Sequence, residues 1–101
     1  MQAVWDANCT VTCHNAGNPS AQLLLTAGMS YGELVNTQGC DLTVRLVTDG
    51  GILTNSMLWR KLSNELNKCG GVMPQGTAGL RSEDAAAMTT VEDWLKQGAK
   101  P

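Results

Sequence analysis

The chain has 101 residues, a length that corresponds to one domain, and we expect that domain to span residues 1–101. Its formal net charge is −2, which argues against DNA or RNA as a partner because nucleic-acid binding needs a basic surface. No stretch approaches the roughly 20 consecutive apolar residues of a membrane-spanning helix.

The composition predicts a thin hydrophobic core. The chain has no Phe, one Tyr and three Trp, together with 11 Gly. A domain of this size buries a modest share of its surface and is only marginally stable. We therefore expect a further source of stability, such as a disulfide or a bound apolar group.

The first predicted element is a short helix over residues 2–8, which leads into the segment CTVTCH at residues 9–14. His14 is the only histidine of the chain, and it directly follows the second of two closely spaced cysteines. This is close to the Cys-x-x-Cys-His pattern of c-type haem attachment, in which two thiols add to the haem vinyl groups and the histidine ligates the iron. The spacer here has three residues instead of two, and an added residue can loop out without moving the flanking thiols.

The same six residues leave two other interpretations open. Cys9 and Cys13 can form a disulfide with each other, or they can belong to a metal site. A zinc site would need further closely spaced cysteine or histidine ligands, and the four cysteines and one histidine do not have that spacing. The turn-rich residues 15–19 follow, where a backbone carbonyl can orient the imidazole of His14.

The middle of the chain predicts three short elements. Ser30 and Glu33 have the spacing of a capping box, which predicts a short helix that stops near residue 36. Residues 42–47 have β-branched content and imperfect alternation, so we expect a short strand or extended segment there. A further helix is predicted over residues 56–67, with Thr54 or Asn55 as its cap.

A glycine-rich loop at residues 69–76 contains the dipeptide Met73-Pro74. If His14 ligates one side of a haem iron, the other side needs methionine, lysine or a terminal amine, because the chain has no second histidine. Met73 is the best candidate, since it alone among the methionines lies in a Gly/Pro-rich loop. The ordinary alternative is that Met73 fills a gap in the core.

The last predicted element is a helix that begins at the N-cap Ser82 and stops at Gly98, with one apolar face. It ends in the sequence WLKQGA at residues 94–99. The segments CTVTCH, VMPQG and EDWLKQGA, in this order and over nearly the whole chain, resemble the small class I cytochrome c domain. The similarity is greatest to the cytochrome c-like domains of bacterial secreted proteins and lipoproteins.

This resemblance implies an all-α, cytochrome c-like fold around one covalently attached haem c. It implies that Cys9 and Cys13 carry the two thioether bonds and that His14 is the proximal iron ligand. Met73 is then the distal ligand, and Pro74 stiffens its loop.

The resemblance also implies a disulfide between Cys40 and Cys69, the pair that brackets the middle of the domain. Four cysteines alone admit three connectivities. This disulfide either holds the Met73 loop near the iron or serves as a plain structural link. By the same resemblance, Pro19 is the residue whose carbonyl orients His14.

The expected function is electron transfer by a monohaem c-type cytochrome that exchanges electrons with redox partner proteins and is not an enzyme. Two alternatives remain: a five-coordinate haem peroxidase or sensor, and a haem-free, disulfide-stapled binding or structural module. Haem attachment and a stable disulfide both indicate a periplasmic, extracellular or surface-exposed location. The N-terminus lacks a signal peptide, so we expect a domain appended to a larger protein.

Overall fold

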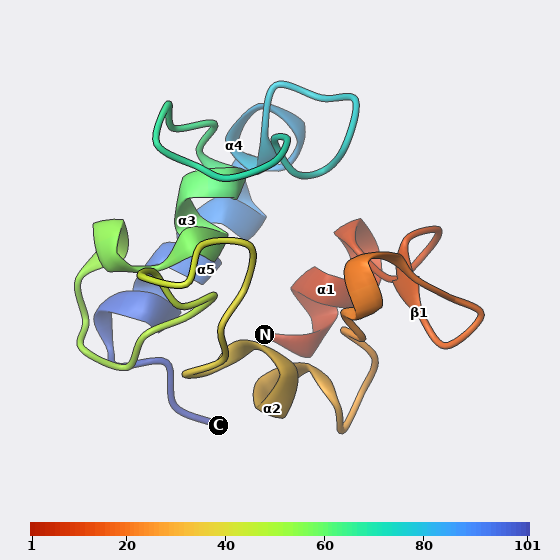
Figure 1. Cartoon of the computed structure of the whole chain (residues 1–101). Coiled ribbons are helices and arrows are strands. Elements are labelled where there is room, and N and C mark those ends of the chain that lie inside the picture. Colours follow the sequence, from red (N-terminus) through yellow and green to blue (C-terminus); the bar gives the residue numbers. More distant parts are fainter.

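The computed structural model describes all 101 residues, and Figure 1 shows short helices joined by long irregular segments. The helices are α1 (Gln2–Asn8), α2 (Ser30–Leu34), α3 (Met57–Leu62), α4 (Leu80–Glu83) and α5 (Ala85–Lys96). Two 3-10 turns, η1 (Ser20–Gln22) and η2 (Leu53–Asn55), and two strands, β1 (His14–Asn15) and β2 (Asn18–Pro19), complete the regular structure. None of the helices is both long and apolar enough to cross a membrane.

The expectation of an all-α, cytochrome c-like fold is wrong. Strands β1 and β2 form a small antiparallel sheet in which His14 pairs with Pro19 and Asn15 with Asn18. The Asn15 side chain closes the turn between them, because its Oδ1 accepts the Asn18 N–H at 2.8 Å. Asparagine commonly closes turns in this way. The chain is a small mixed α/β domain with five short helices.

The segment 42–47 does not form the expected strand. Only single bridges occur here, between Val47 and Val35 and between Arg45 and Gln38. The Asp41 carboxylate accepts both the backbone N–H of Thr43 at 2.8 Å and its hydroxyl at 2.7 Å. This local side-chain turn competes with a strand at the start of the segment.

Helix α3 is half the predicted length. It ends at Leu62, and Asn64 has a φ of 58°, a left-handed conformation that a right-handed helix cannot continue. Leu66, which lies within the predicted helix, is fully exposed. The predicted cap residues of this helix lie inside η2, and Ser56 occupies the N-cap position without a side-chain cap bond.

The predicted terminal helix is divided in two. Ser82 lies inside α4, and Asp84 caps α5, because its carboxylate accepts the Ala87 N–H at 3.1 Å. Gly98 follows the end of α5 with a φ of 96°, as expected for a stop residue. The expected capping box at α2 is also absent: Ser30 donates its hydroxyl hydrogen bond to the Gln2 side chain at 2.8 Å.

The core lies where α1 and α5 meet the central segments. Trp5 of α1 is 1% exposed, and its ring meets that of Trp94 of α5 edge-on, with centroids 6.1 Å apart. Such edge-to-face pairs are a favoured aromatic geometry. The other members of the core cluster are Leu25, Leu34, Val47, Leu62, Leu80, Ala87, Met88, Val91, Leu95 and Ala99.

Candidate functional site

The CTVTCH segment forms a closed loop at the end of α1. Cys9 is the first residue after the helix, and its N–H donates to the Trp5 carbonyl at 2.7 Å. The His14 N–H donates back to the Cys9 carbonyl at 3.0 Å, so the first cysteine and the histidine are joined directly. Val11, in the middle of the spacer, is 71% exposed, whereas Cys9 and Cys13 are half-buried. The three-residue spacer therefore loops outward, as the sequence predicts.

Two asparagines hold the spacer from the neighbouring hairpin. The Asn15 side-chain amide donates to the Thr10 carbonyl at 2.7 Å, and that of Asn18 donates to the Thr12 carbonyl at 2.7 Å. Sequence reasoning assigned these asparagines only to a turn and missed their contacts with the spacer. Because asparagine amides commonly bind backbone carbonyls nearby, the Asn-x-x-Asn pattern after His14 was the available signal.

The imidazole of His14 is fixed by the segment after β2. Its Nδ1 lies 3.0 Å from the Leu23 carbonyl oxygen, and the His14 carbonyl accepts the Leu25 N–H at 3.0 Å. A ring N–H that donates to a backbone carbonyl sets the tautomer and orients the ring, leaving Nε2 as the free ligand atom. The orienting carbonyl is thus that of Leu23 and not that of Pro19, the residue expected from the sequence. Pro19 instead pairs with the backbone of His14 in the two-stranded sheet.

The two thiols of the loop are free. Cys9 and Cys13 form no disulfide, so the structure gives no support to a bond between them. Burial, and to a smaller extent the nearby Cys13, raise the pKa of the Cys9 thiol to about 11. The thiol is therefore protonated near neutral pH. No group of three or more His, Cys, Asp or Glu side chains is placed to hold a metal ion.

The Met73 loop is attached to the end of α3. The Met73 N–H donates to the Lys61 carbonyl at 3.1 Å, and the Lys61 ammonium donates to the Gly71 carbonyl at 3.4 Å. Farther along, the Thr77 hydroxyl donates to the Pro74 carbonyl at 2.6 Å. The role of Lys61 in holding this loop was not predicted from the sequence.

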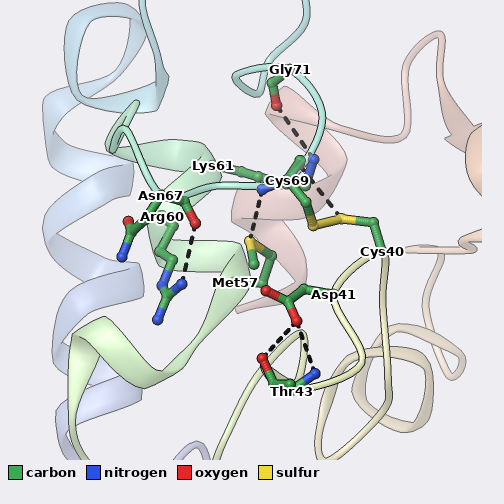
Figure 2. The surroundings of a disulfide bond; sticks show 9 residues. All are labelled: Cys40, Asp41, Thr43, Met57, Arg60, Lys61, Asn67, Cys69 and Gly71. Carbon is green, nitrogen blue, oxygen red and sulfur yellow. Dashed lines mark hydrogen bonds between the residues drawn. A yellow bond between two sulfur atoms is a disulfide. The ribbon is translucent and has the colours of Figure 1, made fainter.

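The structure contains the Cys40–Cys69 disulfide, with the two Cα atoms 6.1 Å apart. It joins the segment after α2 to the start of the Met73 loop, and Figure 2 shows it beside the last turn of α3. The Cys69 N–H also lies 3.5 Å from the Met57 sulfur, which points up from the buried face of α3. The start of the Met73 loop is thus held by the Cys40–Cys69 disulfide and by the contact of the Cys69 N–H with the buried Met57 side chain.

His14 and Met73 lie on different segments of the molecule. In Figure 1 the hairpin that begins with β1 (orange) is well separated from the loop between α3 and α4 (teal). No hydrogen bond joins the two segments, although Cys9, Leu23 and Met73 all pack against the same hydrophobic core. The structure therefore brings Cys9, Cys13 and His14 together in one loop, whereas no hydrogen bond links Met73 to them.

None of the sequence-predicted site residues lines the two cavities described next. A cavity of about 300 Å³ lies between α1, α2 and the C-terminus, and a second of about 260 Å³ lies beside η2 and α3. A haem attached at Cys9 and Cys13 would therefore sit outside both. The loop itself fits such a group, since it offers two free thiols and an oriented histidine with an available Nε2.

No family model matches the chain, and no curated protein or solved structure matches it either.

Proposed function

We propose that this domain carries one haem c, bound through Cys9 and Cys13, and transfers electrons with His14 and Met73 as iron ligands. The proposal rests on the site and not on the fold, which is mixed α/β. The single observation that carries it is the His14 imidazole, which the Leu23 carbonyl orients at 3.0 Å in a loop that also presents two free thiols. A haem bound there would supply one-electron redox chemistry at its iron.

Each residue has a defined task in this proposal. In the neutral imidazole, the hydrogen bond from Nδ1 of His14 to the Leu23 carbonyl places the ring proton on Nδ1 and leaves Nε2 as the nitrogen that can ligate a metal. The thioether of Met73 is a softer ligand than a second imidazole and raises the reduction potential. The neutral thiol of Cys9, whose pKa of about 11 follows mainly from burial, has little tendency to oxidise before attachment.

The proposed location is outside the cytoplasm. The disulfide between Cys40 and Cys69 supports it, because disulfides persist in oxidising compartments and are rare in the cytosol. The proposed partners are redox proteins that contact the domain weakly and transiently.

A second candidate is a five-coordinate haem domain that acts as a sensor or peroxidase. The separation of the His14 and Met73 segments in Figure 1 favours it, since no hydrogen bond joins them. In that case His14 would be the only protein ligand of the iron, which would leave the iron able to bind a small molecule.

The two candidates are separated by visible spectroscopy and a redox titration of protein exported together with a haem-attachment system. Electron transfer through a His14/Met73 centre predicts a low-spin spectrum in both oxidation states and a reversible one-electron titration. A high-spin spectrum that changes on addition of carbon monoxide or cyanide indicates the five-coordinate domain. Protein without visible absorbance contradicts both and indicates a haem-free module.

A further inference from the structure

The cavity of about 260 Å³ lies far from the proposed haem loop in the sequence, between the segment 43–48 and the start of α3. Its lining is polar and includes two cationic side chains but no acidic one. The lining residues are Thr43, Val44, Arg45, Thr48, Asn55 and Arg60.

Both arginines are held in place by backbone carbonyls. The Arg60 Nε donates to the Thr54 carbonyl at 2.9 Å and its Nη1 to the Asn67 carbonyl at 3.2 Å. Arg45 donates from Nη1 to the Asn36 carbonyl. Figure 2 shows the Arg60 guanidinium reaching the Asn67 carbonyl. Fixed side chains lose little conformational entropy when a ligand binds, so this pair is preorganised.

Several donors of the cavity remain without an acceptor in the chain. The Nη2 group of Arg60 and the Nε and Nη2 groups of Arg45 make no hydrogen bond, and neither arginine forms a salt bridge. The Asn55 side chain also makes no hydrogen bond, and it lies at the same cavity. The three residues line one cavity, so each has donors left for a ligand bound there.

The carboxylate of Asp41 lies outside the cavity. Asp41 lies close enough to feel the charge of Arg60, but it is only partly exposed and does not line the cavity. Its carboxylate accepts two hydrogen bonds from Thr43, and Figure 2 shows it turned toward that residue. Two guanidinium charges therefore face the cavity without an acidic partner inside it.

We propose that this cavity binds a phosphate group, either inorganic phosphate or the phosphate of a small molecule. Arginine guanidinium groups recognise phosphate oxygens through paired, charge-assisted hydrogen bonds. Donors from Arg45, Arg60 and Asn55 approach from different elements, which suits a tetrahedral anion better than a planar carboxylate with two oxygens. The proposal is independent of haem, because the cavity shares no residue with the haem loop.

The test is a titration of the full chain with inorganic phosphate at low ionic strength, followed by NMR chemical shifts, with acetate as a parallel titration. We expect saturable binding at one site, with the largest shifts at Arg45, Asn55 and Arg60. Acetate is expected to bind at least tenfold more weakly. A phosphomonoester such as glycerol phosphate then shows whether the cavity accepts an organic phosphate or only the free ion.

Three variants test whether phosphate binds at this cavity and not elsewhere on the chain. Arg45→Gln and Asn55→Ala are each expected to weaken phosphate binding, by at least about tenfold for the arginine. Asn55 makes no side-chain hydrogen bond, so its replacement leaves the fold intact. Lys100→Gln removes one exposed positive charge at the other cavity and is expected to leave binding unchanged.

Three results would overturn the proposal. The first is the absence of saturation by phosphate. The second is an equal loss of affinity in Lys100→Gln and Arg45→Gln, which would indicate a general charge effect. The third is acetate binding as tight as that of phosphate, which would contradict the assigned ligand class.

Discussion

The Nδ1 atom of His14 lies 3.0 Å from the carbonyl oxygen of Leu23, nine residues farther along the chain. This contact crosses the β1–β2 hairpin and leaves Nε2 as the only ring nitrogen without a partner. The backbone of His14 is tied to the same segment through the Leu25 N–H. A histidine held at ring and backbone is preorganised as a ligand, which is why the proposed function depends on it.

The role of Met73 is tested by comparing two methionine variants. If Met73 ligates the iron, Met73→Ala converts the low-spin spectrum of the haem-loaded protein to a high-spin one and lowers the reduction potential. Met29→Ala is the matched control, because Met29 is 45% exposed and lies outside the loop. Visible spectra that respond equally to both changes, or to neither, would argue against ligation by Met73.

The disulfide is expected to contribute strongly to stability. Replacing Cys40 and Cys69 together by Ser opens a link with a sequence separation of 29 residues. The chain-entropy model then predicts a loss of about 3 to 4 kcal/mol in the free energy of unfolding. Urea denaturation measures this loss, and Cys13→Ser, which removes a free thiol, is the control. A loss similar to that of the control would show that the unfolded chain gains little freedom when the link is absent.

Two serines near α3 are expected to have different effects on stability. The buried Ser56 hydroxyl accepts the Thr48 N–H at 3.0 Å, so Ser56→Ala leaves that donor unsatisfied and costs about 1 to 3 kcal/mol. The Ser63 hydroxyl is buried without a partner, so Ser63→Ala is expected to leave stability unchanged or to increase it by about 1 kcal/mol. Denaturation curves of both variants check the contrast, and a larger loss for Ser63→Ala would contradict it.

The raised pKa of Cys9 predicts slow alkylation of the haem-free protein. Thiolate is the reactive form, and a pKa of about 11 in place of 9.0 leaves less thiolate at any pH below both values. At pH 9, Cys9 in the folded chain should therefore react with iodoacetamide on the order of tenfold more slowly than in urea-unfolded chain. Its rate should continue to rise toward pH 11. Mass spectrometry of the labelled peptide measures both rates.

Burial is the larger cause of this shift, and the nearby Cys13 is the smaller one. In Cys13→Ser the alkylation of Cys9 should therefore remain slow, with only a modest acceleration. Full recovery of the unfolded rate in that variant would show that the neighbouring thiol, and not burial, controls Cys9.

Several features could be predicted from local sequence patterns. The first helix has the predicted bounds. On the apolar face predicted for the last helix, Ala87, Met88, Val91 and Leu95 are buried and Trp94 is partly buried. In these two helices the residues with helical periodicity are also those that pack into the core, so the apolar pattern alone was enough to predict each helix. The outward loop of the CTVTCH spacer is similarly local, because one added residue is accommodated within the turn.

Features that depend on side-chain hydrogen bonds could not be predicted in this way. Ser30 looked like a helix cap but binds Gln2, which is 28 residues away, and Asp84 replaces Ser82 as the cap of the last helix. The left-handed Asn64 ends α3 before the apolar pattern ends. The Leu23 carbonyl, which orients His14, could not be predicted either, because a backbone acceptor has no sequence signature.

The most direct test of the central claim is the intact mass of the denatured protein after export together with a haem-attachment system. We predict a mass increase of one haem that survives denaturation and is lost when Cys9 and Cys13 are both replaced by Ser. The Cys40–Cys69 disulfide should be retained in both proteins. An unmodified mass for the wild-type chain, with Cys9 and Cys13 free or oxidised, would contradict covalent haem binding and the function proposed from it.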